Sequence, residues 1–141
     1  SNSMGGGYIS LGDDSDIDLS GVTFGISMWI KPGDNPPNDN NTFFIQGGTT
    51  SINEYLHLQW KSNNDSLRFG FYSDDVNTGS DVVSQGTWSH VVFTYDDVTN
   101  YADIWVDNVR LKHQYHDPGY IGTTTLTNIF SAGTWHPFRE L

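Results

Sequence analysis

The chain has 141 residues, which is the length of one compact domain with a single hydrophobic core. Its formal net charge of −11, with only six Lys and Arg residues, argues against nucleic acid and anionic membranes, because phosphate groups are bound by clustered cations. Cysteine is absent, which excludes disulfides, thiolate metal sites and cysteine nucleophiles. No apolar run is long enough for membrane insertion, and residues 1–7 lack the pattern of a signal peptide.

Apolar and polar residues alternate with a period of two in short segments, which predicts an all-β protein. No segment of helical length has a sustained period of 3.6 residues. In chain order, the predicted strands are 24–30, 42–46, 54–61, 67–72, 88–95, 101–107, 109–112 and 124–131. Residues 34–41 are predicted to form a loop outside the sheets, and the polar residues 62–65 a hairpin turn.

The alternation also predicts which side chains face the core. The expected inward residues of three strands are Leu56, Leu58 and Trp60, then Leu67, Phe69 and Phe71, then Ala102, Ile104 and Val106. The expected outward residues of the same strands are Tyr55, His57, Gln59, Arg68, Tyr72, Tyr101 and Trp105. Each of these strands therefore has one apolar and one polar or aromatic face.

Two stretches of the chain resemble a known family. The run GTWSHVVFTYD at 86–96, followed by ADIWVDN at 102–108, resembles the central hairpin of laminin-G-like domains in the concanavalin A-like superfamily. The run DIDLSGVTFGISMWIKP at 16–32 is similar to an early strand of that family. The resemblance implies a two-sheet antiparallel jelly-roll sandwich, and we expect one such domain over residues 1–141. Lectins, adhesion modules, receptor-binding domains and glycosidases all use this fold, so function must be argued from the site.

The ends of the chain depart from the family pattern. Such domains open with a strand before residues 8–11 and close with a strand beyond Leu141, and neither pattern is visible. We therefore expect the domain to lack the family's first and last strands, which would leave an unpaired sheet edge. Because such an edge invites pairing with another chain, one hypothesis is a structural subunit of a filament, capsid or other homo-oligomer, assembled by edge-strand complementation.

We expect no enzymatic activity and no required cofactor. Glycosidases of this fold place two carboxylates about 5 Å apart from a Glu-x-Asp-x-Glu run, which is absent here. Asp103 and Asp107 lie on one face of one strand, but about 13 Å apart at their Cα atoms. No Ser lies in a Gly-x-Ser-x-Gly motif.

Carbohydrate binding needs aromatic rings for the apolar faces of sugars and polar groups that fix their orientation. If the two central strand pairs lie in one sheet, a suitable set would share one face: Tyr55, His57, Arg68, Tyr72, Tyr101 and Trp105. Trp105 is the predicted anchor, because its neighbours Ile104 and Val106 face the core; packing of Trp105 under a loop or against another subunit is the alternative. Trp29, Trp60 and Trp88 are predicted to be structural, since the family builds its core from their strands.

Many relatives bind calcium between loops, and the candidate ligands here are Asp13, Asp14, Asp74 and Asp75. The alternative is that these are solvated acids in turns. Asn40 and Asn64 begin N-glycosylation acceptor patterns in predicted loops.

The sequence thus predicts a non-catalytic binding module, extracellular or on a particle surface. Its expected role is carbohydrate binding or adhesion, and its expected partner is a glycan or glycoprotein surface.

Overall fold

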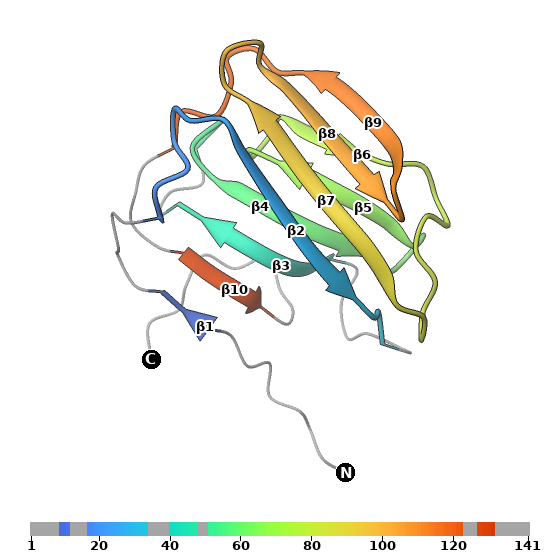
Figure 1. The fold of residues 1–141 in the computed structure, drawn as a ribbon. Helices are drawn as coiled ribbons and strands as arrows, with labels where there is room; N and C mark the ends of the chain where they lie inside the picture. Colours follow the sequence, from blue (N-terminus) through green and yellow to red (C-terminus); the bar gives the residue numbers. More distant parts are fainter. Residues whose placement is uncertain (1–8, 12–16, 34–39, 48–50, 123–126, 132–141) are drawn as a thin grey trace.

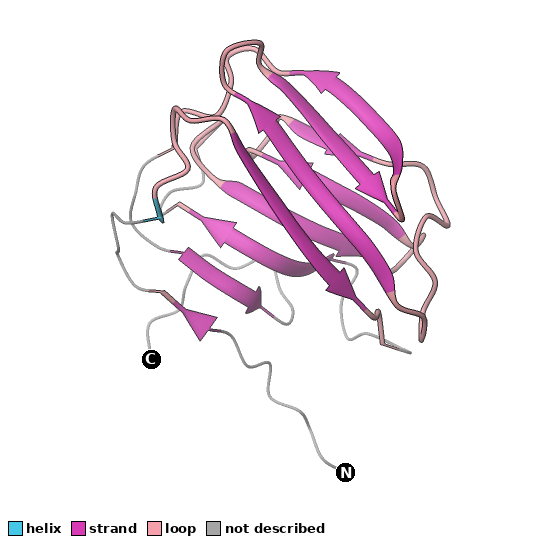
Figure 2. Cartoon of the chain, viewed as in Figure 1, coloured by secondary structure: helices cyan, strands magenta, loops and turns pink. Residues whose placement is uncertain are grey.

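The structure is a computed structural model that describes residues 9–11, 17–33, 40–47, 51–122 and 127–131. Two antiparallel sheets pack face to face (Figure 1). Their strands are β1 (Ile9–Ser10), β2 (Phe24–Ile30), β3 (Asn40–Gln46), β4 (Leu56–Lys61), β5 (Ser66–Gly70), β6 (Asp75–Asn77), β7 (Ser89–Asp96), β8 (Tyr101–Val106), β9 (Val109–Tyr115) and β10 (Thr127–Ser131). Strands and their connecting loops make up nearly all of the described chain (Figure 2).

One sheet has six strands in the order β1-β10-β3-β4-β5-β6, and the other has four in the order β2-β7-β8-β9. The predicted fold class, an all-β antiparallel sandwich, is confirmed. No helix among the described residues combines the length and the apolar character needed to cross a membrane.

Most strands lie where the alternation predicts them. β2 has the predicted bounds, while β9 continues three residues past the predicted end at Lys112. β3 begins at Asn40, so Asn40 and Asn41, predicted to lie in a loop, belong to the sheet. The three-residue strand β6 was not predicted, because it is too short to show a period.

The two central hairpins lie in different sheets, so the condition under which the predicted ligand set would share one face is not met. The β4–β5 hairpin pairs with β3 and β6, whereas the β7–β8 hairpin pairs with β2 and β9. Period-two alternation shows which side of a strand faces the core, but both sheets face the same core. It therefore carries no information about which sheet a hairpin joins.

The core lies between the sheets and is rich in aromatic residues. Phe69 of β5 is in edge-on contact with Phe24, Phe71 and Phe93, at ring-centroid distances of 6.1, 5.2 and 5.8 Å. Edge-on pairs of this kind are favourable beyond the area that they bury. Trp60 is 3% exposed, as its predicted structural role requires.

Trp29 and Trp88 are not in the core, and the prediction that they are structural is wrong. Their side chains are 62% and 60% exposed. In β2 the core side is occupied by Phe24, Ile26 and Ile30, which leaves Trp29 on the opposite face. The two tryptophans belong to the surface of the four-stranded sheet.

The first and last described strands close one edge of the six-stranded sheet. β1 pairs with β10, and β10 pairs with β3. β10 lies within the predicted strand 124–131. Residues 1–8 and 132–141 lie outside the described residues, so the absence of the family's terminal strands stays a prediction.

Candidate functional site

The outer face of the six-stranded sheet carries two rows of side chains across β4, β5 and β6. Leu58, Phe69 and Val76 of these strands face the core, so the residues next to them in the chain face outward. The strand registers align His57 with Gly70 and Asp75 in one row, and Gln59 with Arg68 and Asn77 in the next. We call these residues the network face.

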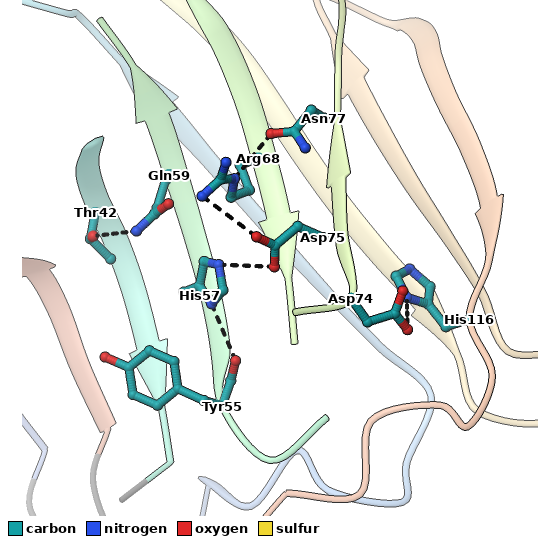
Figure 3. A network of polar contacts seen from close by, with 9 residues as sticks. All are labelled: Thr42, Tyr55, His57, Gln59, Arg68, Asp74, Asp75, Asn77 and His116. Atoms are coloured by element: carbon teal, nitrogen blue, oxygen red, sulfur yellow. Dashed lines mark hydrogen bonds and ion pairs between the residues drawn. The ribbon is translucent and has the colours of Figure 1, made fainter. Parts of the chain in front are cut away.

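In the first row, a glycine lets two charged groups meet across a strand. His57 Nε2 lies 3.3 Å from Asp75 Oδ1, although β5 runs between their strands (Figure 3). Gly70 occupies the position between them, and a Cβ atom there would collide with both the His57 ring and the Asp75 carboxylate. The contact between His57 and Asp75 therefore requires glycine at position 70.

In the second row, Arg68 is held on two sides. Its Nε donates a hydrogen bond to Asn77 Oδ1 at 3.0 Å, and its guanidinium lies 3.5 Å from Asp75 Oδ2. Figure 3 shows His57, Arg68 and Asp75 pointing toward one another from three neighbouring strands. Because each group is positioned by another, the array is fixed before any ligand arrives.

The charges around Asp75 decide its protonation. Partial burial opposes ionisation of this carboxyl, but the hydrogen bond from His57 and the positive charges of His57, Arg68 and His116 outweigh it. The pKa of Asp75 consequently lies below its ordinary value. The carboxylate remains an acceptor at neutral and mildly acidic pH.

Two tyrosines border the network face. The Tyr55 ring lies 5.8 Å from the His57 ring and 6.5 Å from the Tyr72 ring, which it meets edge-on. Burial raises the pKa of Tyr55 to about 12, so its hydroxyl is neutral at physiological pH. Tyr72 adopts a φ of 67°, which is uncommon for a residue with a side chain and turns the chain between β5 and β6.

Gln59 belongs to the same face and was not predicted as a site residue. Its Nε2 donates to Thr42 Oγ1 at 3.2 Å, but its Oε1 is buried and has no hydrogen-bond partner among the described residues. The signal was present in the sequence, because Gln59 has the same alternation phase as Tyr55 and His57. An unpaired buried acceptor is unfavourable, and a ligand hydroxyl that reached it would satisfy it.

The predicted ligand set does not gather on one face. Tyr55, His57, Arg68 and Tyr72 lie together on the network face, whereas Tyr101 and Trp105 are on β8 in the four-stranded sheet. The two groups are therefore on opposite outer surfaces of the sandwich. The reason is the sheet assignment of the two hairpins described above.

The predicted calcium ligands are not brought together in the described part of the chain. Asp13 and Asp14 lie outside the described residues. Asp74 and Asp75 point away from each other, with Asp74 Oδ2 lying 2.7 Å from the buried His116 (Figure 3). No three His, Cys, Asp or Glu side chains of the described residues form a metal-binding group. Calcium binding stays a prediction.

The two glycosylation candidates differ in setting. Asn64 lies in the turn between β4 and β5 and is exposed, as predicted. Asn40 is the first residue of β3 rather than a loop residue, and its Oδ1 is buried. Modification at either position stays a prediction.

Several solved structures share the fold. The binding domain of Paraclostridial Mosquitocidal Protein 1 has a TM-score of 0.66 at 16% identity, over 89% of this chain and 33% of that one. A Ruminococcus gnavus IT-sialidase CBM40 bound to α2,3-sialyllactose has a TM-score of 0.59 at 9% identity, over 77% and 63%. Domain 4 of AbnA, an extracellular arabinanase from Geobacillus stearothermophilus, in complex with arabinotriose, has a TM-score of 0.56 at 19% identity, over 94% and 70%.

At these low identities the TM-scores show a shared fold alone, and the chain spans less than two thirds of the first two structures. No curated protein sequence matches the chain. The family model of the concanavalin A-like lectin/glucanases superfamily matches residues 3–138, and the chain therefore belongs to that superfamily.

Proposed function

We propose that this protein is a non-catalytic glycan-binding module, extracellular or surface-associated, whose binding site is the network face. The observation that carries the proposal is the array of Arg68, Asp75 and His57, fixed by mutual contacts and bordered by two tyrosines.

A sugar presents hydroxyl groups that both donate and accept hydrogen bonds, and the network face offers both kinds of partner. Arg68 has five N–H donors, and its contacts with Asp75 and Asn77 leave others for a ligand. The Asp75 carboxylate, whose side chain is 21% exposed, is an acceptor. Because the charged groups are already oriented, binding would cost little side-chain entropy.

Sugar binding also needs apolar contacts, and the rings of Tyr55 and Tyr72 can supply them. Tyr55 and Tyr72 are half-buried, so their ring positions are defined while part of each ring remains accessible. A ring of this kind packs against the apolar C–H face of a sugar. Two of the fold neighbours were solved with sialyllactose and with arabinotriose, which supports a carbohydrate as the ligand class.

A non-catalytic role is proposed because the sequence lacks the acid run that glycosidases of this fold use. On the network face, Asp75 is paired with Arg68 and His57. A carboxylate whose pKa is lowered by such neighbours is a poor general acid at neutral pH.

The test compares Arg68→Ala with Lys31→Ala, which removes an exposed cation just beyond β2 that is not part of the network face. Both variants and the parent would be titrated calorimetrically with a panel of mono- to trisaccharides that includes sialyllactose and arabinotriose. Arg68→Ala is expected to weaken binding of the best ligand at least tenfold, which corresponds to about 1.4 kcal/mol. Lys31→Ala should leave that affinity unchanged.

Arg68→Lys is a milder substitution, because it keeps the positive charge but loses the planar guanidinium group. An affinity between those of the parent and Arg68→Ala is therefore expected. Thermal unfolding of each variant controls for loss of fold. A folded Arg68→Ala protein with the parent's affinity would overturn the network face as the site.

A further inference from the structure

The outer face of the four-stranded sheet is hollowed along β7. A hollow of about 520 Å³ lies toward one end, and one of about 280 Å³ lies toward the other. Thr94 lines both, so the two hollows adjoin at this residue of β7. We call the two hollows together the trough; its other lining residues include Gly25, Val92, Tyr101, Trp105 and His113.

The floor of the trough consists of small side chains. The strand register places Gly25 beside Thr94 and Ser27 beside Val92. Gly25 is inside a strand, where glycine is unfavourable unless something approaches the backbone closely. Here no packing contact requires it, because a Cβ atom would meet only Thr94 Cγ2 at 3.6 Å and the Phe93 carbonyl oxygen at 3.9 Å. The missing side chain leaves the floor open.

One side of the trough is an aromatic wall built from β8 and β9. The Tyr101 ring stacks on the His113 ring at 4.2 Å with an interplanar angle of 3°. His113 Nδ1 lies 2.7 Å from Asp103 Oδ1, which holds the imidazole in place. The Arg110 guanidinium lies over the Trp105 ring at 5.6 Å. These contacts fix the orientations of the wall's rings.

Exposed tryptophans extend the aromatic surface beyond one end of the trough. Trp29 packs beside His90 at a ring distance of 5.1 Å, and His90 Nε2 is 2.8 Å from Ser27 Oγ. Trp88 lies two residues before His90 in the chain and is 60% exposed. Large exposed aromatic groups that adjoin a hollow mark a binding surface.

We infer that the trough is a second binding site, which takes a neutral glycan chain of several sugar rings lying along β7 against Trp105 and Tyr101. From His90 to Asp96 the two hollows follow seven residues of strand, whose six intervals span about 20 Å at roughly 3.3 Å each, which suits a chain better than a single sugar. Hydroxyl groups and glycine on the floor fit a sugar chain better than the apolar core of a protein interface.

Charge also selects the ligand. Asp96 and Asp103 border the trough, and the whole chain carries a net charge of −11. A polyanionic glycan would be repelled, whereas a neutral chain would not. The inference shares the ligand class of the proposed function, but it concerns the opposite outer face and depends on none of the network residues.

Gly25→Val is the most informative variant, because it fills the floor with a side chain that suits a strand and whose Cβ meets its neighbours only at ordinary contact distances. The matched control is Gly79→Val, at a glycine with no atom within 4 Å of its added Cβ. Both would be titrated with neutral gluco-, xylo-, galacto- and arabino-oligosaccharides of one to six residues, following tryptophan fluorescence. Trp105→Ala completes the set.

The parent is expected to bind at least one of these series with an affinity that rises with chain length. Gly25→Val and Trp105→Ala should each lower that affinity tenfold or more, while Gly79→Val leaves it unchanged. Parent-like binding by folded Gly25→Val and Trp105→Ala would overturn the trough and leave the network face untouched. The inference would also be overturned if the parent showed no length-dependent binding and sedimentation showed association through this face. The face would then be a contact between copies of the chain.

Discussion

Gly70 and Gly25 lie on the outer faces of the two sheets, and each is a glycine for a different physical reason. Gly70 is required by its neighbours, because His57 and Asp75 meet in the space that a Cβ would occupy. Gly25 is required by nothing that the structure describes around it. Gly70 therefore allows the side-chain contacts within the network face, whereas Gly25 leaves the surface of the four-stranded sheet open.

Gly70→Ala is expected to lower the free energy of unfolding by about 1–2 kcal/mol, because the added methyl group displaces the His57 ring and the Asp75 carboxylate from each other. Urea denaturation measures the loss. Gly25→Ala, which adds the same methyl group in ordinary contact distance, is the control and should be neutral or slightly stabilising. Equal effects of the two substitutions would contradict the reason given for Gly70.

The lowered pKa of Asp75 predicts a pH dependence of stability. The carboxylate is stabilised in the folded state, so its contribution is complete above the unfolded-state pKa of about 3.9. That contribution is lost as pH falls through the lower folded-state pKa. Between pH 5 and pH 2, unfolding free energies from urea curves should fall more steeply for the parent than for Asp75→Asn. Parallel profiles would show that the charge of Asp75 is not stabilised by the fold.

At the scale of residues, the sequence predicted side-chain direction better than it predicted role. The alternation that puts Phe24, Ile26 and Ile30 inward also puts Trp29 outward, yet the resemblance to a family that builds its core from this strand favoured a core assignment. The same phase rule identifies Gln59 as outward. Which outward residues contact one another depends on register across strands, as in the row from His57 to Asp75, and no local pattern carries that information.

At the scale of elements, Gln46 links three segments of the chain. Its side chain is 2% exposed, accepts a hydrogen bond from the Leu19 amide at 2.9 Å and donates to Thr127 Oγ1 at 3.0 Å and to the Ile17 carbonyl oxygen. Thr127 begins β10, so this one amide fastens both β10 and residues 17–19 to β3.

Gln46→Leu is expected to lower the free energy of unfolding by about 2 kcal/mol or more. The substitution keeps the side-chain volume but leaves buried hydrogen-bond donors and acceptors without a partner. Gln85→Leu is the matched control, since Gln85 is exposed and makes one surface hydrogen bond to Asp65. Chemical denaturation of both variants tests the difference. A Gln46→Leu protein as stable as the control would show that the three segments are held by packing alone.

Elements with strong local signals were predictable, and those that depend on distant partners were not. β2, β4, β7 and β8 each contain at least three alternating apolar residues, which suffice to locate them. The short strand β6 exists because β5 offers it a partner, and a three-residue segment shows no period of its own. The choice of sheet for each hairpin is likewise a tertiary outcome, and it is what separated Trp105 from Arg68.

At the scale of the whole molecule, the sandwich presents two chemically different outer faces. The network face is polar, crowded and partly buried, while the trough face exposes aromatic rings along a strand. Both faces belong to a strongly acidic chain, which disfavours polyanionic partners.

The edge strands bear on the self-assembly hypothesis. In the described part of the chain, the outermost strands of the six-stranded sheet have two and three residues, and β9 at an edge of the other sheet carries Arg110 and Lys112. These three edges are short or charged and are unfavourable templates for another strand, whereas β2, the fourth edge, has seven residues and no charged side chain. Light scattering is therefore expected to give the mass of one 15.8 kDa chain at all concentrations. A mass that grows with concentration would support edge-strand complementation instead.

The most direct test of the central claim is a glycan-array screen of the purified protein, run once with millimolar calcium and once with a chelator. The account predicts binding to a restricted set of glycans, with neutral chains among them. Loss of signal in the chelator alone would add calcium as a requirement. A silent array in both buffers would contradict glycan binding at either face and leave a structural role for the domain.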